Sequence, residues 1–265
     1  INSELVSIKN TISHDMNKYI EHHWQKKCLI NPQLFNGNLI KLQSIHLQKG
    51  KPPKINFTNT NFKLFLGTCE PHYWHYIAED GSYFASPVTI NPILITSDNK
   101  LIIANRTPAA NVTEPWEFPG GFLSTDYDVT NNSIIFERAA LREIREELLH
   151  DIELINPTFL GISYCNRIIV QNIHIVCKLN RTYQKINEQR KINRHKITDF
   201  KEVSQMDYIE LDPNELLSTI RYCKTRLKDT SIASAILVGR KYFGEEWFKE
   251  ALTISKVKLA LLDDE

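Results

Sequence analysis

The sequence lacks three features that would assign the protein to a functional class: paired cysteines, a long apolar run and a large net charge. Its five cysteines are odd in number and widely spaced, with no Cys-x-x-Cys pair, which argues against a zinc site and a disulfide framework. No run of about 18 apolar residues occurs, so no transmembrane helix is expected. The net charge is only +1, which gives no global field to draw the protein onto nucleic acid or an acidic membrane. The first residues also lack the basic-then-apolar layout of a signal peptide, so we expect a cytoplasmic protein with reduced cysteines.

The most informative feature that is present is a cluster of carboxylates. Residues 142–147 read Arg-Glu-Ile-Arg-Glu-Glu, in a segment with helical spacing of apolar residues. On a helix Glu143 faces both Glu146 and Glu147, and each like-charged pair is destabilising by a few tenths of a kcal/mol, roughly. A hard divalent cation such as Mg²⁺ reverses that sign, because it prefers oxygen ligands. The pattern therefore favours a metal site on this helix.

Upstream of the cluster lies a tight turn, Pro119-Gly120-Gly121, after a strand end. This turn, followed by Ala-Ala-Leu-Arg-Glu-Ile-Arg-Glu-Glu at 139–147, resembles the signature of the Nudix hydrolases. That signature reads Gly, five residues, Glu, seven residues, then Arg-Glu-aliphatic-x-Glu-Glu-x-Gly-aliphatic. The resemblance implies an α/β/α sandwich and metal-dependent hydrolysis of a nucleoside diphosphate linked to another moiety, with Mg²⁺ as cofactor and Mn²⁺ as an alternative.

The half of the signature near Gly121 departs from the pattern. The pattern places its Arg 14 positions after its Gly, but Gly121 and Arg142 are 21 apart, so seven extra residues intervene. The early Glu is due at position 134, where this chain has Ile134. Glu137 lies out of register and is a candidate replacement. Leu149 stands where the pattern has its late Gly.

The candidate site residues follow from this resemblance. Glu143, Glu146 and Glu147 are the candidate metal ligands, and any of them could be the general base. Arg142 would orient a catalytic carboxylate through a bidentate pair, which suits a planar guanidinium, or would simply pair with Glu146 on the surface. Two glycines and two polar residues complete the set as candidate substrate-binding residues: Gly120 and Gly121 in the turn, Arg106 at a strand end, and Asn166 in a loop between strands.

The rest of the chain predicts an α/β organisation. Residues 1–86 read as a small α+β extension, and 87–265 as the Nudix-like domain, with 42% hydrophobic residues overall to build a core. Predicted strands are 39–47, 62–66, 93–96, 101–104, 158–165, 168–179 and 206–211. Predicted helices are a polar segment to about residue 27, the carboxylate helix at 133–149 with Ser133 as its N-cap, and segments at 215–224, 230–243 and 247–262.

Two short segments of the extension point to a branch of the family. Asn-Pro-Gln-Leu-Phe-Asn-Gly at 31–37 and Phe-Lys-Leu-Phe-Leu-Gly-Thr at 62–68 look like the UDP-glucose pyrophosphatase branch. That resemblance implies cleavage of UDP-glucose to UMP and glucose 1-phosphate.

Three other functions remain open. One is the same chemistry on ADP-ribose or a dinucleoside polyphosphate, and another is a catalytically inactive Nudix fold that binds a ligand or partner. The third is an RNA-end hydrolase, against which the near-neutral charge argues. Eight lysines and arginines do gather at 178–201, but aromatic residues are not interleaved as stacking platforms, so we expect a solvated loop or hairpin there. We therefore expect a small-molecule nucleotide-sugar substrate, with no nucleic-acid or membrane partner.

Overall fold

The computed structural model describes residues 2–7, 12–69, 84–106, 116–165, 169–222 and 227–255. The strands are β1 (Asn2–Leu5), β2 (Asn38–His46), β3 (Lys54–Asn61), β4 (Val88–Ile95), β5 (Lys100–Arg106), β6 (Trp116–Glu117), β7 (Gly121–Phe122), β8 (Val129–Thr130), β9 (Ser133–Ile134), β10 (Ile155–Cys165), β11 (Val170–Lys178) and β12 (Val203–Glu210). The helices are α1 (His14–Ile30), α2 (Phe62–Thr68), α3 (Phe136–Glu147), α4 (Tyr183–Ile192), α5 (Pro213–Tyr222), α6 (Asp229–Phe243) and α7 (Glu245–Ser255), with short 3-10 turns at Arg194–Lys196 and Phe200–Glu202.

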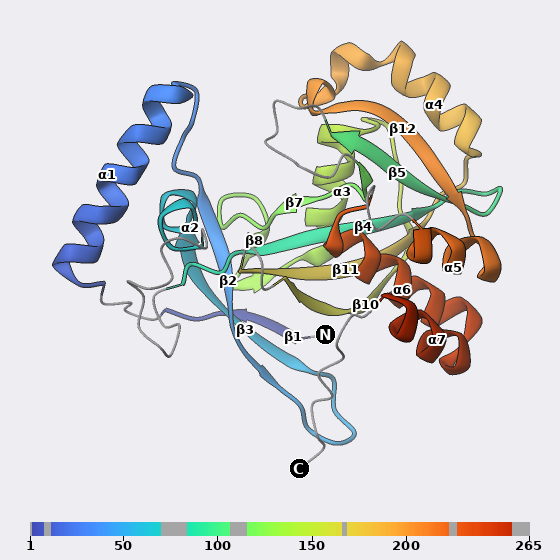
Figure 1. Cartoon of the computed structure of the whole chain (residues 1–265), viewed down its shortest axis with the longest axis horizontal. Helices are drawn as coiled ribbons and strands as arrows, with labels where there is room; N and C mark the ends of the chain where they lie inside the picture. The colour runs from blue at the N-terminus through green and yellow to red at the C-terminus, as the bar shows by residue number, and fades with distance from the viewer. Residues whose placement is uncertain are drawn as a thin grey trace.

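A seven-stranded mixed sheet forms the centre of the molecule, with the order β10-β11-β4-β5-β12 and with β6 and β7 paired to β5 and β4 (Figure 1). Helix α3 covers one face, and α5, α6 and α7 cover the other. Alternate residues of β4 supply both cores, because Ile90 and Leu94 pack on the α3 side while Ile93 and Ile95 pack on the α6 side. The predicted α/β/α sandwich is therefore confirmed.

The N-terminal part forms a separate three-stranded sheet with the order β1-β3-β2. Helices α1 and α2 accompany it, and α1 lies at the periphery, away from the central sheet (Figure 1). This is the small α+β extension that the sequence predicts, while the division at residue 86 stays a prediction. None of the helices in the described ranges combines the length and apolar character needed to cross a membrane.

A split in the central sheet determines where the site lies. Strands β4 and β5 pair only at Ile95 and Leu101, next to their connecting turn. Farther along, β7 pairs with β4 at Ile90–Gly121, and β6 pairs with β5 at Ala104–Glu117. The Pro119–Gly120 turn that joins β6 to β7 therefore lies between the two diverging strands.

Three local predictions are wrong. Residues 62–68 form helix α2 and not a strand, because the Asn61 side chain caps the segment by accepting a hydrogen bond from the Leu64 amide at 2.9 Å. Ser133 is no N-cap, since it lies in β9 and α3 begins three residues later. The basic stretch at 178–201 is no loop or hairpin, because it contains α4, which Thr182 caps.

Candidate active site

Two carboxylates of α3 are buried at the edge of the sheet. Ala140 and Ile144 pack into the core between α3 and the sheet, which turns the same side of the helix toward the protein. Glu143 and Glu147, one turn apart, are thereby drawn in, with exposed fractions of 6% and 3%. Glutamates are rarely this buried unless they are paired or bind a metal, so these two need partners.

The Pro119–Gly120 turn lies directly against these carboxylates. The Gly120 amide donates to Glu147 Oε2 at 3.3 Å, and its φ of +151° favours glycine. A Cβ on Gly120 would lie 2.2 Å from the Ile90 carbonyl oxygen, and one on Gly121 would lie 2.4 Å from Glu143 Oε2. Both glycines are therefore required for close packing between the turn, β4 and the carboxylates. The structure brings together all four of these predicted site residues.

Arg142 makes the bidentate pair, but with a residue that the sequence prediction missed. Its Nε donates to Asp128 Oδ1 at 3.1 Å and its Nη2 to Asp128 Oδ2 at 2.9 Å. The Asp128 side chain is fully buried and also accepts from the Ser124 amide at 2.9 Å. The same guanidinium contacts Glu143 at 2.7 Å and Glu146 at 2.9 Å through Nη1, so the orienting pair and the pair with Glu146 coexist.

A hairpin explains the irregular spacing. Asp128 follows Gly121 by seven positions, against six for the early Glu of the signature, and precedes Arg142 by 14 against eight. The six extra residues after Asp128 equal the β8–β9 hairpin, residues 129–134. Its two turn residues, Asn131 and Asn132, have φ values of +50° and +60°, typical of a type I′ turn. The signal that could have revealed Asp128 is an acidic residue one position from the register counted from Gly121.

Burial disfavours the charged forms of two of these carboxylates. Burial raises the pKa of Glu143 to about 7, although the adjacent Arg142 charge opposes the shift. Burial also raises the pKa of Glu146, again against the pull of Arg142. Three acidic groups, Asp128, Glu143 and Glu146, thus contact one guanidinium, and a bound cation would relieve the excess negative charge.

The carboxylates suit a divalent metal in chemistry but are not arranged as a ligand group. Across the described residues no three His, Cys, Asp or Glu side chains are grouped to hold a metal ion. Glu143 and Glu146 turn toward Arg142, whereas Glu147 turns toward the Gly120 amide. The buried oxygens of Glu143 and Glu147, with the half-buried Glu146, are hard ligands that fit Mg²⁺ or Mn²⁺, so the predicted metal set stays a proposal.

The segment after α4 holds the carboxyl end of α3. This contact was not predicted from the sequence. The Asp199 amide donates to the Glu146 carbonyl at 2.8 Å. Arg190, 5% exposed, fixes that segment by donating to the Val203 carbonyl at 2.8 Å. Burial lowers the pKa of Arg190, and the nearby Glu147 charge opposes the shift.

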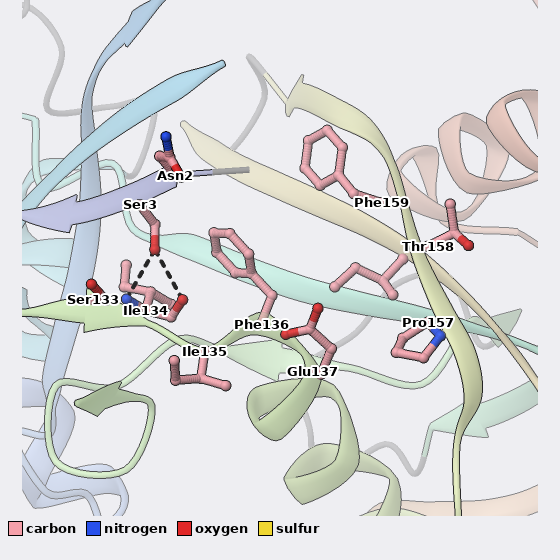
Figure 2. A pocket seen from close by; sticks show the side chains of 11 residues that line it. Asn2, Ser3, Ser133, Ile134, Ile135, Phe136, Glu137, Pro157, Thr158 and Phe159 are labelled. Carbon is pink, nitrogen blue, oxygen red and sulfur yellow. Dashed lines mark hydrogen bonds between the residues drawn. The ribbon is translucent and has the colours of Figure 1, made fainter. Parts of the chain in front are cut away.

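Glu137 lies elsewhere. It lines a cavity of about 700 Å³ at the amino end of α3, where β1 and β10 form the other walls (Figure 2). Glu137, the candidate replacement for the early Glu, therefore lies apart from the turn, and the buried acidic partner of Arg142 is Asp128.

Two predicted substrate-binding residues, Arg106 and Asn166, lie at or beyond the limits of the described residues. Arg106 is the last residue of β5, the strand that pairs with β6 ahead of the glycine turn, but its side chain is outside the described part of the structure. Asn166 lies outside the described residues altogether. Their proposed roles stay predictions.

No protein-family model matches the chain, and no curated protein matches it. Among solved structures it is similar to a Nudix hydrolase from Nitrosomonas europaea, with 12% identity, 58% of this chain and 88% of that chain covered, and a TM-score of 0.40. It is also similar to a MutT Nudix hydrolase from Burkholderia pseudomallei (17% identity, 57% and 96% covered, TM-score 0.36). A third is a bifunctional NMN adenylyltransferase/ADP-ribose pyrophosphatase from Francisella tularensis (16% identity, 59% and 42% covered, TM-score 0.39). At these scores the likenesses carry no weight for function.

Proposed function

We propose that this chain is a Nudix-type, Mg²⁺-dependent pyrophosphohydrolase. The observation that supports this most is that the two parts of the motif, which are separated in sequence, lie in contact in the structure. Arg142 binds Asp128 in a fork while the glycine turn lies against Glu143 and Glu147. An ordinary amphipathic helix is not expected to bury two glutamates against two glycines at which an added Cβ would clash with its neighbours.

Glu143, Glu146 and Glu147 would hold the metal, which would neutralise pyrophosphate charge and lower the pKa of an attacking water. Arg142, anchored by Asp128, holds Glu143 and Glu146 near each other through Nη1. The Gly120 amide orients the Glu147 carboxylate from the other side. One carboxylate among the three would serve as the general base.

For the substrate we propose a nucleoside diphosphate sugar, with UDP-glucose cleaved to UMP and glucose 1-phosphate. The support is the pair of sequence segments at 31–37 and 62–68, and so it is weaker than the support for the reaction. ADP-ribose and dinucleoside polyphosphates are the competing substrates for the same site.

A product analysis tests both levels of this proposal. The purified chain is incubated with Mg²⁺ or Mn²⁺ and, in parallel, with UDP-glucose, ADP-ribose and a dinucleoside tetraphosphate, and the products are separated. UMP and glucose 1-phosphate support the sugar-nucleotide assignment, whereas AMP and ribose 5-phosphate would replace it. Binding of a nucleotide without turnover at any metal concentration would instead show an inactive binding module.

A further inference from the structure

The glycine turn is held from behind by the first turn of α6. Three contacts join β6 and the next residue, Phe118, to this end of the helix. The Lys228 amide donates to the Trp116 carbonyl at 3.1 Å, and Lys228 Nζ contacts Glu117 Oε2 at 2.5 Å. The Phe118 amide donates to the Ser231 hydroxyl at 3.0 Å. The strand leading into the turn is thus fixed to α6 through main chain and side chains together.

These contacts are protected from water. Ser231 is 2% exposed, and Phe118 is equally buried in the core beneath α6. The Glu117 side chain is 7% exposed, while that of Lys228 is 28% exposed. A hydrogen bond or ion pair in such a place is stronger than on the surface, and losing one partner leaves the other unsatisfied.

The anchored amide is close along the chain to the amide that contacts the candidate metal ligand. Only Pro119 lies between Phe118, whose amide is held by Ser231, and Gly120, whose amide donates to Glu147. Pro119 between them restricts the backbone, so little slack exists in which a shift could be absorbed. Displacement at Phe118 is therefore passed on to the contact between Gly120 and Glu147.

We propose that Ser231 and Lys228 are positioning residues that set the Gly120 amide against Glu147 and thereby tune metal affinity at the site. This inference rests on the proposed function for the metal ligands as well as for the reaction. The contact between α6 and the turn is a property of the protein without metal, and it can be measured there.

Helix α6 offers a matched control. Ser234, one turn after Ser231, is also fully buried, and its hydroxyl bonds His174 Nδ1 at 2.8 Å instead of the strand that leads to the turn. Since Ser234 also donates to the Thr230 carbonyl, it accepts from His174. Ser231→Ala and Ser234→Ala each remove one buried serine hydroxyl from the same helix, and each should lower the urea midpoint of unfolding by a comparable amount.

The first measurement uses the purified protein without substrate. Mn²⁺ binding is followed by electron paramagnetic resonance, and the Gly120 amide by its ¹H–¹⁵N chemical shift and hydrogen exchange. We expect Ser231→Ala to weaken Mn²⁺ binding about tenfold and to shift the Gly120 resonance, while Ser234→Ala leaves both within twofold of the wild type. Lys228→Met should resemble Ser231→Ala, and Lys228→Arg should restore binding because it keeps the charge near Glu117.

The second measurement is turnover with the substrate found in the product analysis. In Ser231→Ala the Mg²⁺ concentration for half-maximal rate should rise about tenfold, with little change of the substrate KM at saturating metal. Equal effects in Ser231→Ala and Ser234→Ala, or an unmoved Gly120 resonance in Ser231→Ala, would overturn the positioning role. If no substrate is turned over, the proposed function fails, and the Mn²⁺ and Gly120 measurements still decide the positioning role.

Discussion

The two halves of the carboxylate motif reach the same site by different routes. Residues 142–147 are regular in sequence and lie on one helix, so helical spacing alone brings Glu143 and Glu147 together. The half from Gly121 to Ile135 is irregular, and Asp128 reaches Arg142 only because a hairpin takes up the extra length. The Ile135 amide donates to the Asp128 carbonyl at 3.0 Å, so the chain is nearly at the same place before and after the hairpin. An insertion thus leaves the geometry of the pair intact when its two ends meet.

The N-terminal extension supports the irregular half and does not touch the regular one in the same way. Ser3 in β1 bonds both the amide and the carbonyl of Ile134, at 3.0 and 2.9 Å (Figure 2). The Leu5 amide donates to the Asn132 carbonyl at 2.7 Å. The hairpin is therefore docked onto the extension by hydrogen bonds, whereas α3 meets the extension by apolar packing in the shared core, where Phe136 lies edge-on to Phe57.

The largest effect on stability is expected where the two halves meet. Asp128→Ala should lower the free energy of unfolding by about 3 kcal/mol, because it breaks a buried ion pair and leaves the Ser124 amide without its acceptor. It should also reduce kcat at least tenfold, since Arg142 loses its anchor. Urea unfolding and steady-state rates measure both.

Asp126→Ala is the control for that substitution. Asp126 lies two residues away, and its carboxylate accepts only exposed contacts from Asn38, at 3.1 and 3.3 Å. We expect less than about 0.5 kcal/mol and no change of rate. Comparable losses in the two variants would mean that Asp128 has no special part in the site.

The next effect concerns the regular half. Glu147→Gln should lower kcat by at least about 100-fold, the scale of losing a metal ligand or base, while the fold is retained. Glu137→Gln is the matched change at the other end of the same helix, and its rate should stay within about twofold of the wild type, as expected of a residue outside the reacting groups. Wild-type turnover in Glu147→Gln would remove α3 from the site, and a loss in Glu137→Gln would restore the role that the sequence first suggested for it.

Local patterns were sufficient for the parts of the fold that depend on neighbours along the chain. The β4–β5 hairpin, the strands β10 and β11 and the helix α3 all follow from period and turn residues. Gly120 and Gly121 were predicted as substrate-binding residues in a tight turn, whereas their contact with Glu143 and Glu147 is known only from the structure.

Pairings across the insertion could not be predicted in this way. The partner of Arg142 depends on how residues 129–134 fold back, and counting back from Arg142 leads to Ile134, whereas the count forward from Gly121 ends one position short of Asp128. The strand prediction for residues 62–68 was wrong for a similar reason. Their apolar pattern suits a strand, but the Asn61 cap stabilises a helix instead. Ser133 has the composition of a helix cap, but its pairing with Thr130 in the hairpin prevails.

Removing the insertion sharpens the comparison directly. Excision of residues 129–134, joining Asp128 to Ile135, should keep kcat within about tenfold, because the ends are already adjacent. Stability should fall by about 2 kcal/mol, since Ile134, 4% exposed, leaves the core. The rate is compared with that of Ile134→Ala, which loses the same core contact but keeps the loop. Complete loss of activity in the excision variant alone would show that the hairpin itself shapes the site.

The smallest effect tests whether the extension holds the hairpin. Ser3→Ala removes both bonds to Ile134 and should lower the unfolding free energy by about 1 kcal/mol, with kcat unchanged. Amide exchange should accelerate at Ile134 and at its neighbours in β8 and β9, while the α3 amides stay protected, because α3 is held by core packing that does not depend on the Ser3 hydrogen bonds. Ser44→Ala, in β2 of the same small sheet, loses side-chain contacts to His46 and Asn56 and serves as the control. If exchange in the hairpin rises equally in both variants, the extension stabilises the hairpin only through its own folding, and the direct link from Ser3 is refuted.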